Sequence, residues 1–221
     1  MNFFDKLQEE TAAARQELLR VQIIQDALAG RIDVAQYLAF LSQAYHHVRH
    51  TVPLLMACGS RLPDRLGWLR TAISEYIEEE IGHEEWILCD IAACGGDPEK
   101  VRQSRPALET ELMVAYAYHQ IDRGNAVGFF GMVHVLEGTS TAIATTAADA
   151  IGTNLGLPET AFTYLTSHGN LDVEHVKFFA RLMNQVEDGA DQQAVIHCAR
   201  AVYRLYGDIF RALPRGSRRA A

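Results

Sequence analysis

The sequence has few of the features that mark β-proteins, membrane-spanning proteins or nucleic-acid-binding proteins. Alternation of apolar and polar residues, the signal for half-buried strands, is nearly absent. No apolar run reaches the ~20 residues that a transmembrane helix requires. The formal net charge of −8 argues against nucleic acid and anionic membrane surfaces as general partners. The N-terminal residues lack the basic and apolar regions of a signal peptide, so we expect a cytoplasmic protein.

Cysteine is also scarce, and its spacing argues against two common uses. The four cysteines lie in helical patterns, without the paired spacing of a metal site or of a disulfide framework. They are Cys58, Cys89, Cys94 and Cys198. We therefore expect reduced, structural thiols, as is usual in the cytoplasm.

What the sequence does contain is nearly continuous helical periodicity. Gly30 is expected to end the first helix, Asp33 to cap the second and Pro53 to kink it. The expected helices cover about residues 3–29, 34–58, 64–94, a short segment after 98, 106–123, 126–153, 158–186 and 190–212. The pattern predicts an all-α protein with a single domain of about seven helices over residues 1–214, followed by a short disordered basic tail at 215–221.

The expected helix 158–186 places ionisable residues where its apolar pattern requires core. His168, Asp172 and His175 are spaced i, i+4 and i+7, so they share one helical face. The apolar stripe continues on that face through Phe162, Leu165, Phe179 and Leu182. Burying the three groups bare would cost on the order of several kcal/mol each. A bound metal ion removes this objection, because imidazoles and carboxylates are ordinary ligands of first-row metals.

The same anomaly recurs on two other expected helices. Glu80 and His83 form a Glu-x-x-His pair on the apolar stripe of helix 64–94, and Glu137 lies on the apolar face of helix 126–153. Helical bundles build di-metal sites from such inward pairs and from bridging glutamates. The predicted metal ligands are therefore Glu80, His83, Glu137, His168, Asp172 and His175. Glu79 is an alternative to Glu80, because it lies four residues before His83.

Each of these features has an ordinary structural interpretation when it is taken alone. A single inward histidine is more often a hydrogen-bonded core residue than a ligand, and a Glu-x-x-His pair is common on helices by chance. The acidic residues around Glu80 mostly form a solvated helix face. The combination on separate helices, always in phase with an apolar stripe, favours a di-metal site over these interpretations.

The order of these motifs resembles that of the heme-oxygenase-like diiron oxidases and oxygenases, whose relatives on the same fold include the TenA thiaminases and PqqC. The chain has the Glu-x-x-His pair at Glu80 and His83, then the lone Glu137, then a His-x-x-x-Asp-x-x-His motif that begins at His168. The resemblance extends from the second expected helix to about residue 186. The last motif is quite specific, whereas the first two are weaker alone.

This resemblance implies a single-domain, seven-helix heme-oxygenase-like bundle. It implies two Fe(II) ions at the six predicted positions, O2 as co-substrate, and a small organic acid, amine or amino-acid-like substrate. The implied reactions are oxidative cleavage, decarboxylation or N-oxygenation. Another divalent metal stays open, because ligand identity alone ranks metals poorly. A homodimer, the commonest homo-oligomer, is the default expectation for assembly.

Other functions on the same fold also stay open from the sequence. A heme oxygenase needs one axial histidine, which His46, His47 or His50 could supply, but the six inward ionisable groups would then be unexplained. A TenA-like hydrolase needs a nucleophilic cysteine beside a carboxylate, and Cys89 is out of phase with Glu80 and His83. A non-catalytic metal-binding or partner-binding bundle is the alternative of a different class.

Three further residues are candidates for a pocket beside the metals. Tyr164 lies one turn before His168, and His134 lies one turn before Glu137. Phe130 shares the face of His134 and is expected in the core or in the pocket wall.

Overall fold

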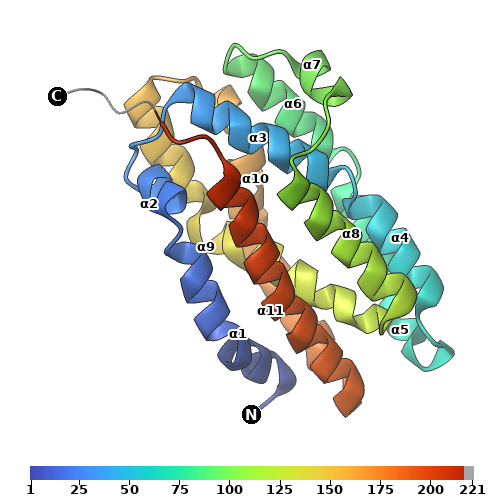
Figure 1. Cartoon of the computed structure of the whole chain (residues 1–221). Coiled ribbons are helices and arrows are strands. Elements are labelled where there is room, and N and C mark those ends of the chain that lie inside the picture. The colour runs from blue at the N-terminus through green and yellow to red at the C-terminus, as the bar shows by residue number, and fades with distance from the viewer. Residues whose placement is uncertain (217–221) are drawn as a thin grey trace.

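The structure, a computed structural model, is described for residues 1–216, with the exception of the side chains of residues 168–175. These residues form eleven α-helices and three short 3-10 helices, and no strand occurs among them (Figure 1). The α-helices are α1 (Phe3–Leu19), α2 (Gln22–Leu28), α3 (Val34–Val48), α4 (Thr51–Arg61), α5 (Gly67–Glu80), α6 (His83–Ala93), α7 (Pro98–Gln103), α8 (Leu108–Arg123), α9 (Phe130–Leu155), α10 (Thr163–Met183) and α11 (Gly189–Ala212). The 3-10 helices are η1 (Asp64–Leu66), η2 (Ala126–Phe129) and η3 (Glu159–Ala161). The prediction of an all-α protein is confirmed, and residues 217–221 of the predicted tail lie outside the described part of the chain.

The helices outnumber the predicted seven because several expected helices are interrupted. The expected helix 3–29 divides after Leu19 into α1 and α2. The second divides after Val48, so Pro53 lies in the first turn of α4, where no backbone hydrogen bond is lost. The third divides at Gly82, whose φ of 92° is a conformation that glycine adopts without steric cost. The prediction of one continuous helix over 64–94 was therefore wrong, and the break falls between Glu80 and His83.

Two predicted helix boundaries are confirmed by their local geometry. The carboxylate of Asp33 accepts the backbone N–H of Gln36, and the Gln36 side chain accepts the backbone N–H of Asp33, which completes a capping box at the start of α3. Gly30 follows α2 with a φ of 65°, and a Cβ there would lie 2.8 Å from the carbonyl oxygen of Ala150. Glycine is therefore required where the turn after α2 approaches α9.

The apolar core has two parts, and α9 and α10 run through both of them. The larger part packs between α1, α4, α5, α8 and α11, and includes Val135 of α9 and Phe179 of α10. The smaller part packs between α3 and α6, and includes Ala144 of α9 and Leu165 of α10. Between Val135 and Ala144, no described residue of α9 is a buried member of either part. Glu137 lies in this interval, so the middle of an apolar helix is polar where the two parts meet.

Helix α9 is apolar for most of its length. Ala126–Leu155 is the one stretch of the described chain whose length and composition would suffice to cross a membrane, and 56% of its most apolar window is buried inside the protein. The helix contacts α2, α10 and α11, and the cover that these helices provide accounts for its apolar composition (Figure 1).

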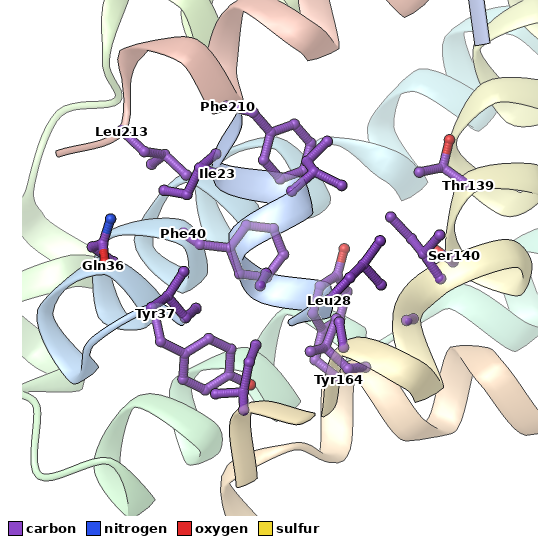
Figure 2. Close-up of a pocket in the computed structure, with 18 of the residues that line it drawn as sticks. Ile23, Leu28, Gln36, Tyr37, Phe40, Thr139, Ser140, Tyr164, Phe210 and Leu213 are labelled. Atoms are coloured by element: carbon purple, nitrogen blue, oxygen red, sulfur yellow. The ribbon is translucent and has the colours of Figure 1, made fainter. Parts of the chain in front are cut away.

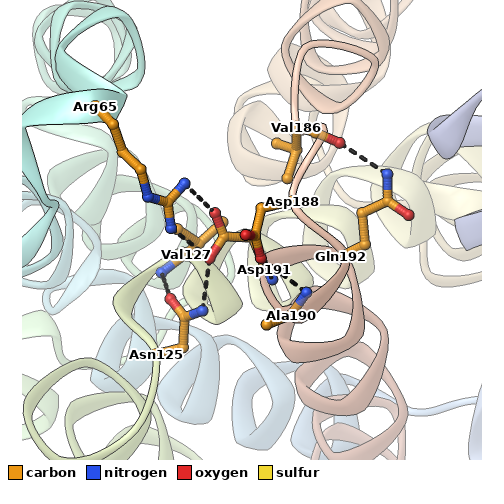
Figure 3. A network of polar contacts seen from close by, with 8 residues as sticks. All are labelled: Arg65, Asn125, Val127, Val186, Asp188, Ala190, Asp191 and Gln192. Atoms are coloured by element: carbon orange, nitrogen blue, oxygen red, sulfur yellow. Dashed lines mark hydrogen bonds and ion pairs between the residues drawn. The ribbon is translucent and has the colours of Figure 1, made fainter.

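A buried carboxylate joins three segments at one end of the bundle (Figure 3). Asp191, in the first turn of α11, is 1% exposed. It accepts two hydrogen bonds from the guanidinium of Arg65, at 2.7 and 3.1 Å, and one from the side-chain amide of Asn125, at 2.7 Å. Asn125 in turn accepts the backbone N–H of Val127 at 3.1 Å and so caps η2. The network therefore fixes η1, η2 and α11 relative to one another.

The hydrogen bonds of this network also set the ionisation of Asp191. Burial alone would raise the pKa of Asp191, but the hydrogen bonds from Arg65 and Asn125 and the charge of Arg65 outweigh it and hold the pKa below its ordinary value. Because the folded pKa is depressed, the stabilisation is complete above the unfolded carboxyl pKa of about 3.9. It is lost as the pH falls through the folded value.

We expect Asp191→Ala to lower the free energy of unfolding by about 3 kcal/mol at pH 7, because three hydrogen bonds to a buried charge are lost. The matched control is Asp208→Ala on the same helix, which breaks an exposed pair with Arg211 and should cost less than about 0.5 kcal/mol. Urea denaturation at pH 7 and at pH 3 measures both variants, and the difference between them should shrink at pH 3. Equal losses at pH 7 would contradict the role of this network.

Candidate metal centre

A cavity of about 70 Å³ lies where the two parts of the core meet. Its wall includes two carboxylates, Glu80 at the end of α5 and Glu137 on α9. The other titratable side chains in the wall are His47, Tyr76, Tyr164 and Tyr206. No lysine or arginine occurs among the described residues that line it. We call this space the carboxylate cavity, since it brings two acidic side chains together without a lysine or arginine in its described wall.

The break between α5 and α6 brings Glu80 and His83 together. Glu80 is the last residue of α5 and His83 the first of α6. The Nδ1 atom of His83 lies 3.2 Å from Oε2 of Glu80. The His83 ring is buried and stacks on Trp86 with 4.0 Å between ring centroids. The predicted pair therefore meets across a turn rather than along one helix, and the indole fixes the plane of the imidazole.

Glu80 and Glu79 differ in position, although the sequence left the choice between them open. Glu80 lines the carboxylate cavity, and its side chain is 16% exposed. Glu79 is exposed and does not line the cavity. The position of Glu80 is thus the one that suits a ligand.

The two carboxylates influence neighbouring phenols. Burial raises the pKa of Tyr76, and the charge of Glu137 raises it further. Burial likewise raises the pKa of Tyr164, with contributions from Tyr206 and from Glu80. Both phenols therefore stay protonated at neutral pH, where a phenolic O–H can donate a hydrogen bond to a carboxylate or to a ligand.

The remaining three predicted ligands belong to α10. The backbone is helical from Thr163 to Met183, so the spacing of His168, Asp172 and His175 is a helical spacing, as predicted. Their side chains lie outside the described part of the structure. Helix α10 packs on α9 and on α6, the helices that carry Glu137 and His83.

Of the three predicted pocket residues, one lines the carboxylate cavity and two lie in the core. Tyr164 lines the carboxylate cavity. Phe130 is fully buried in the larger part of the core, and the neighbouring Phe129 lines the cavity in its place. A residue on the inward face of α9 can therefore lie either in the core or in the cavity wall.

His134 belongs to the core and does not line the carboxylate cavity. Its Nε2 atom lies 3.3 Å from the hydroxyl oxygen of Thr11, and its ring stacks on Phe179 with 5.9 Å between centroids. Burial, with a smaller contribution from the charge of Arg15, lowers the pKa of His134 to about 4. The imidazole is therefore neutral at neutral pH, a hydrogen-bonded core histidine.

Two cavity residues had no place in the predicted site. His47 of α3 is 3% exposed, and its ring meets Tyr206 of α11 edge-on with 5.9 Å between centroids. His47 follows Ala44 by three residues, so its position at the flank of the apolar stripe of α3 was the available signal. Nothing in the spacing of Tyr206 indicated the site, because the contact with α3 is purely tertiary.

The described donors fit iron in chemical type. Two carboxylates and an imidazole supply the oxygen and nitrogen ligands that non-heme iron takes. Among the side chains that the structure describes, no group of three His, Cys, Asp or Glu residues is arranged to hold a metal ion. A complete site therefore requires further ligands, and α10 carries three predicted ones beside these helices.

A family model described as iron-containing redox enzyme, of heme-oxygenase type, matches residues 38–207. The chain belongs to this family. The match spans Glu80, His83, Glu137 and the whole of α10. The family description supports an iron-containing oxidoreductase as the general function of the protein. None of the curated proteins gives a match to the chain.

Solved structures resemble this iron-containing redox enzyme over nearly its whole length. A domain of unknown function with a heme oxygenase-like fold from Shewanella denitrificans is 25% identical, with a TM-score of 0.86 over 94% of this chain and 90% of that one. A TenA homologue from Pseudomonas syringae is 11% identical, with a TM-score of 0.80 over 94% and 90%. Heme oxygenase-1 from Synechocystis, in complex with heme, is 12% identical, with a TM-score of 0.74 over 95% and 91%. These likenesses confirm the predicted heme-oxygenase-like fold.

In this redox enzyme a buried carboxylate outside the predicted ligand set anchors α10. Asp90 lies on α6, seven residues after His83, and is fully buried. It accepts the backbone N–H groups of Thr163 at 3.0 Å and of Tyr164 at 2.8 Å. No residue of α10 itself caps that end by a side chain, so the cap comes from α6. Burial raises the pKa of Asp90, although these hydrogen bonds oppose the rise. Keeping this carboxylate ionised in the interior therefore costs free energy.

We expect Asp90→Ala to lower the free energy of unfolding by about 2 kcal/mol, because two buried N–H groups lose their acceptor. It should also lower the iron retained per chain, because α10 is no longer held against the helix of His83. The matched control is Asp97→Ala, which removes an exposed cap from the N–H groups of Glu99 and Lys100.

The control should cost about 1 kcal/mol and leave the iron content unchanged. Urea denaturation and iron analysis after gel filtration measure the two effects separately. Full iron retention in Asp90→Ala would show that the position of α10 does not depend on this cap.

Proposed function

We propose that the protein is a non-heme diiron enzyme that uses O2 to oxidise a small organic acid, amine or amino-acid-like substrate. The reaction would be an oxidative cleavage, a decarboxylation or an N-oxygenation. One observation carries the proposal: Glu80 and Glu137, from different helices, line a single cavity, and His83 lies 3.2 Å from Glu80. Membership of an iron-containing redox family supports the choice of iron.

Six residues would hold the iron, namely Glu80, His83, Glu137, His168, Asp172 and His175. Their three carboxylates would offset three of the four positive charges of two Fe(II) ions. Bound iron would supply the O2 activation and the redox change that no amino-acid side chain provides.

The residues around the ligands have identifiable tasks. The protonated phenol of Tyr76 can orient the carboxylate of Glu137 through a hydrogen bond, and the phenol of Tyr164 lines the same cavity as Glu80 and is influenced by its charge. The indole of Trp86 holds the ring of His83. Apolar side chains of both core parts complete the wall of the cavity and keep water away from the reacting groups.

Two alternatives on this fold find less support. A cavity of about 70 Å³ holds on the order of five to seven water-sized groups, far less than a porphyrin requires. A nucleophilic cysteine is missing from the described wall of the carboxylate cavity. Burial raises the pKa of both Cys58 and Cys198 to about 12, the opposite of what a reactive thiolate needs.

We expect anaerobic loading with Fe(II), followed by desalting, to leave about two iron ions per chain. Glu80→Ala and Glu137→Ala should each retain about one ion or fewer, because each removes a carboxylate from the cavity wall. Glu79→Ala is the matched control, since it removes the adjacent exposed carboxylate, and should retain the full content. Iron below about one ion per chain in the unmodified protein would contradict the proposal.

Oxygen consumption by the iron-loaded protein separates an enzyme from a metal-binding bundle. Uptake that depends on one member of a panel of acids and amines, and that continues over many turnovers, would support catalysis. Slow oxidation at the same rate with and without every panel member would instead support storage or sensing.

A further inference from the structure

A second cavity, of about 80 Å³, shares lining residues with the carboxylate cavity. Figure 2 shows the side chains that line this second cavity. Its wall is formed mainly by apolar side chains of α2, α3, α9 and α11, and no charged residue occurs in its described lining. Ser140, Tyr164 and Tyr206 line both cavities. We call the second cavity the apolar chamber. The three shared side chains lie where the chamber meets the space that Glu80 and Glu137 line.

A row of aromatic rings forms one wall of the apolar chamber (Figure 2). Tyr37 and Phe40 stack with 6.3 Å between centroids, and Phe40 stacks on Phe210 at 5.7 Å. Phe210 meets Tyr206 at 4.9 Å, and Tyr206 meets His47 at 5.9 Å. The row thus runs from the chamber into the carboxylate cavity. Interlocked rings change shape little, so the chamber is a preformed site for an apolar group.

Two polar groups at the edge of the chamber are occupied within the protein. The hydroxyl of Tyr37 donates to the carbonyl of Ala161 at 2.9 Å, and the amide of Gln36 donates to the carbonyl of Pro214 at 3.1 Å. The buried hydroxyl of Thr139 has no hydrogen-bond partner among the described residues. A water molecule needs two to four polar partners, so most of the chamber favours an apolar occupant over water.

We infer that the apolar chamber holds the uncharged aliphatic tail of the substrate, while the polar head lies in the carboxylate cavity. The inference rests on the proposed function for the chemistry at the head. A volume of about 80 Å³ accepts on the order of five to eight water-sized groups, so the tail has about five to eight carbon atoms. The carbon atoms nearest the head then pass Ser140, Tyr164 and Tyr206, the residues common to both cavities.

Two residues of the chamber can change its volume without touching the carboxylate cavity. Ala144, on α9, is buried, lines the chamber and does not line the carboxylate cavity. Leu28, on α2, is half-buried, lines the chamber and does not line the carboxylate cavity. Ala142, exposed on α9, lines neither space and serves as the control position.

The test measures binding of straight-chain primary alcohols, from butanol to decanol, to the iron-free full-length protein by calorimetry. These probes carry the tail without a metal-binding head. We expect the affinity to rise roughly fourfold per methylene up to an optimum length and then to stop rising. Ala144→Leu should shorten the optimum by about two to three carbons and Leu28→Ala should lengthen it by a similar amount, while Ala142→Leu should leave it unchanged.

The opposite shifts support the inference, and a flat series or an optimum that both variants leave in place overturns it. If Ala144→Leu does not fold, Leu28→Ala decides alone, because it adds no volume. Iron loading is measured on the same preparations. Two ions per chain with a flat alcohol series would reject the chamber and keep the proposed function. A shifting optimum without iron binding would keep the chamber and reject the diiron site.

Discussion

The structure depends on placing acidic groups between two apolar clusters at the middle of α9. A bare carboxylate in such a place costs on the order of several kcal/mol, against a total stability of about 5–15 kcal/mol for a domain. Glu137 occupies the interval of α9 that contributes no buried residue to either cluster, and Glu80 faces the same space from α5. The polar interval therefore explains both why the core is divided and why cavities remain at the division. An arrangement this costly requires that the charge be offset, and the proposed dications would do so directly.

Much of the fold follows from periodicity and caps, because these are local properties. The capping box at Asp33 and the left-handed Gly30 mark boundaries that a sequence shows directly. The breaks were harder to predict. The apolar phase of helix 64–94 continues across Gly82, so nothing in the pattern separates α5 from α6. The pairing of Glu80 with His83 survived this error, since residues three apart stay neighbours across a short turn.

For the candidate site, helical phase identified residues that point inward but could not say into which part of the interior. Glu137 and His134 share a face of α9, yet Glu137 lines the carboxylate cavity and His134 packs against Phe179. The difference arises from which helix lies opposite each turn, which is a tertiary property. The same reason hid Tyr206, whose contact with His47 joins two helices far apart in the sequence. The apolar chamber was out of reach too, because α2 exists only through an interruption that the pattern did not reveal.

Helix α10 connects these features. Asp90 holds its first turn to α6, Tyr164 lies in that turn and lines both cavities, and His168 follows one turn later. A group filling the chamber therefore contacts α10 immediately before its predicted ligands. A contact that fixes the position of the first turn of α10 also fixes the position of the predicted ligands in the next turns, because a helix transmits displacement along its axis. Substrate binding and metal binding would then share α10 as a common element, and each would strengthen the other by the same factor.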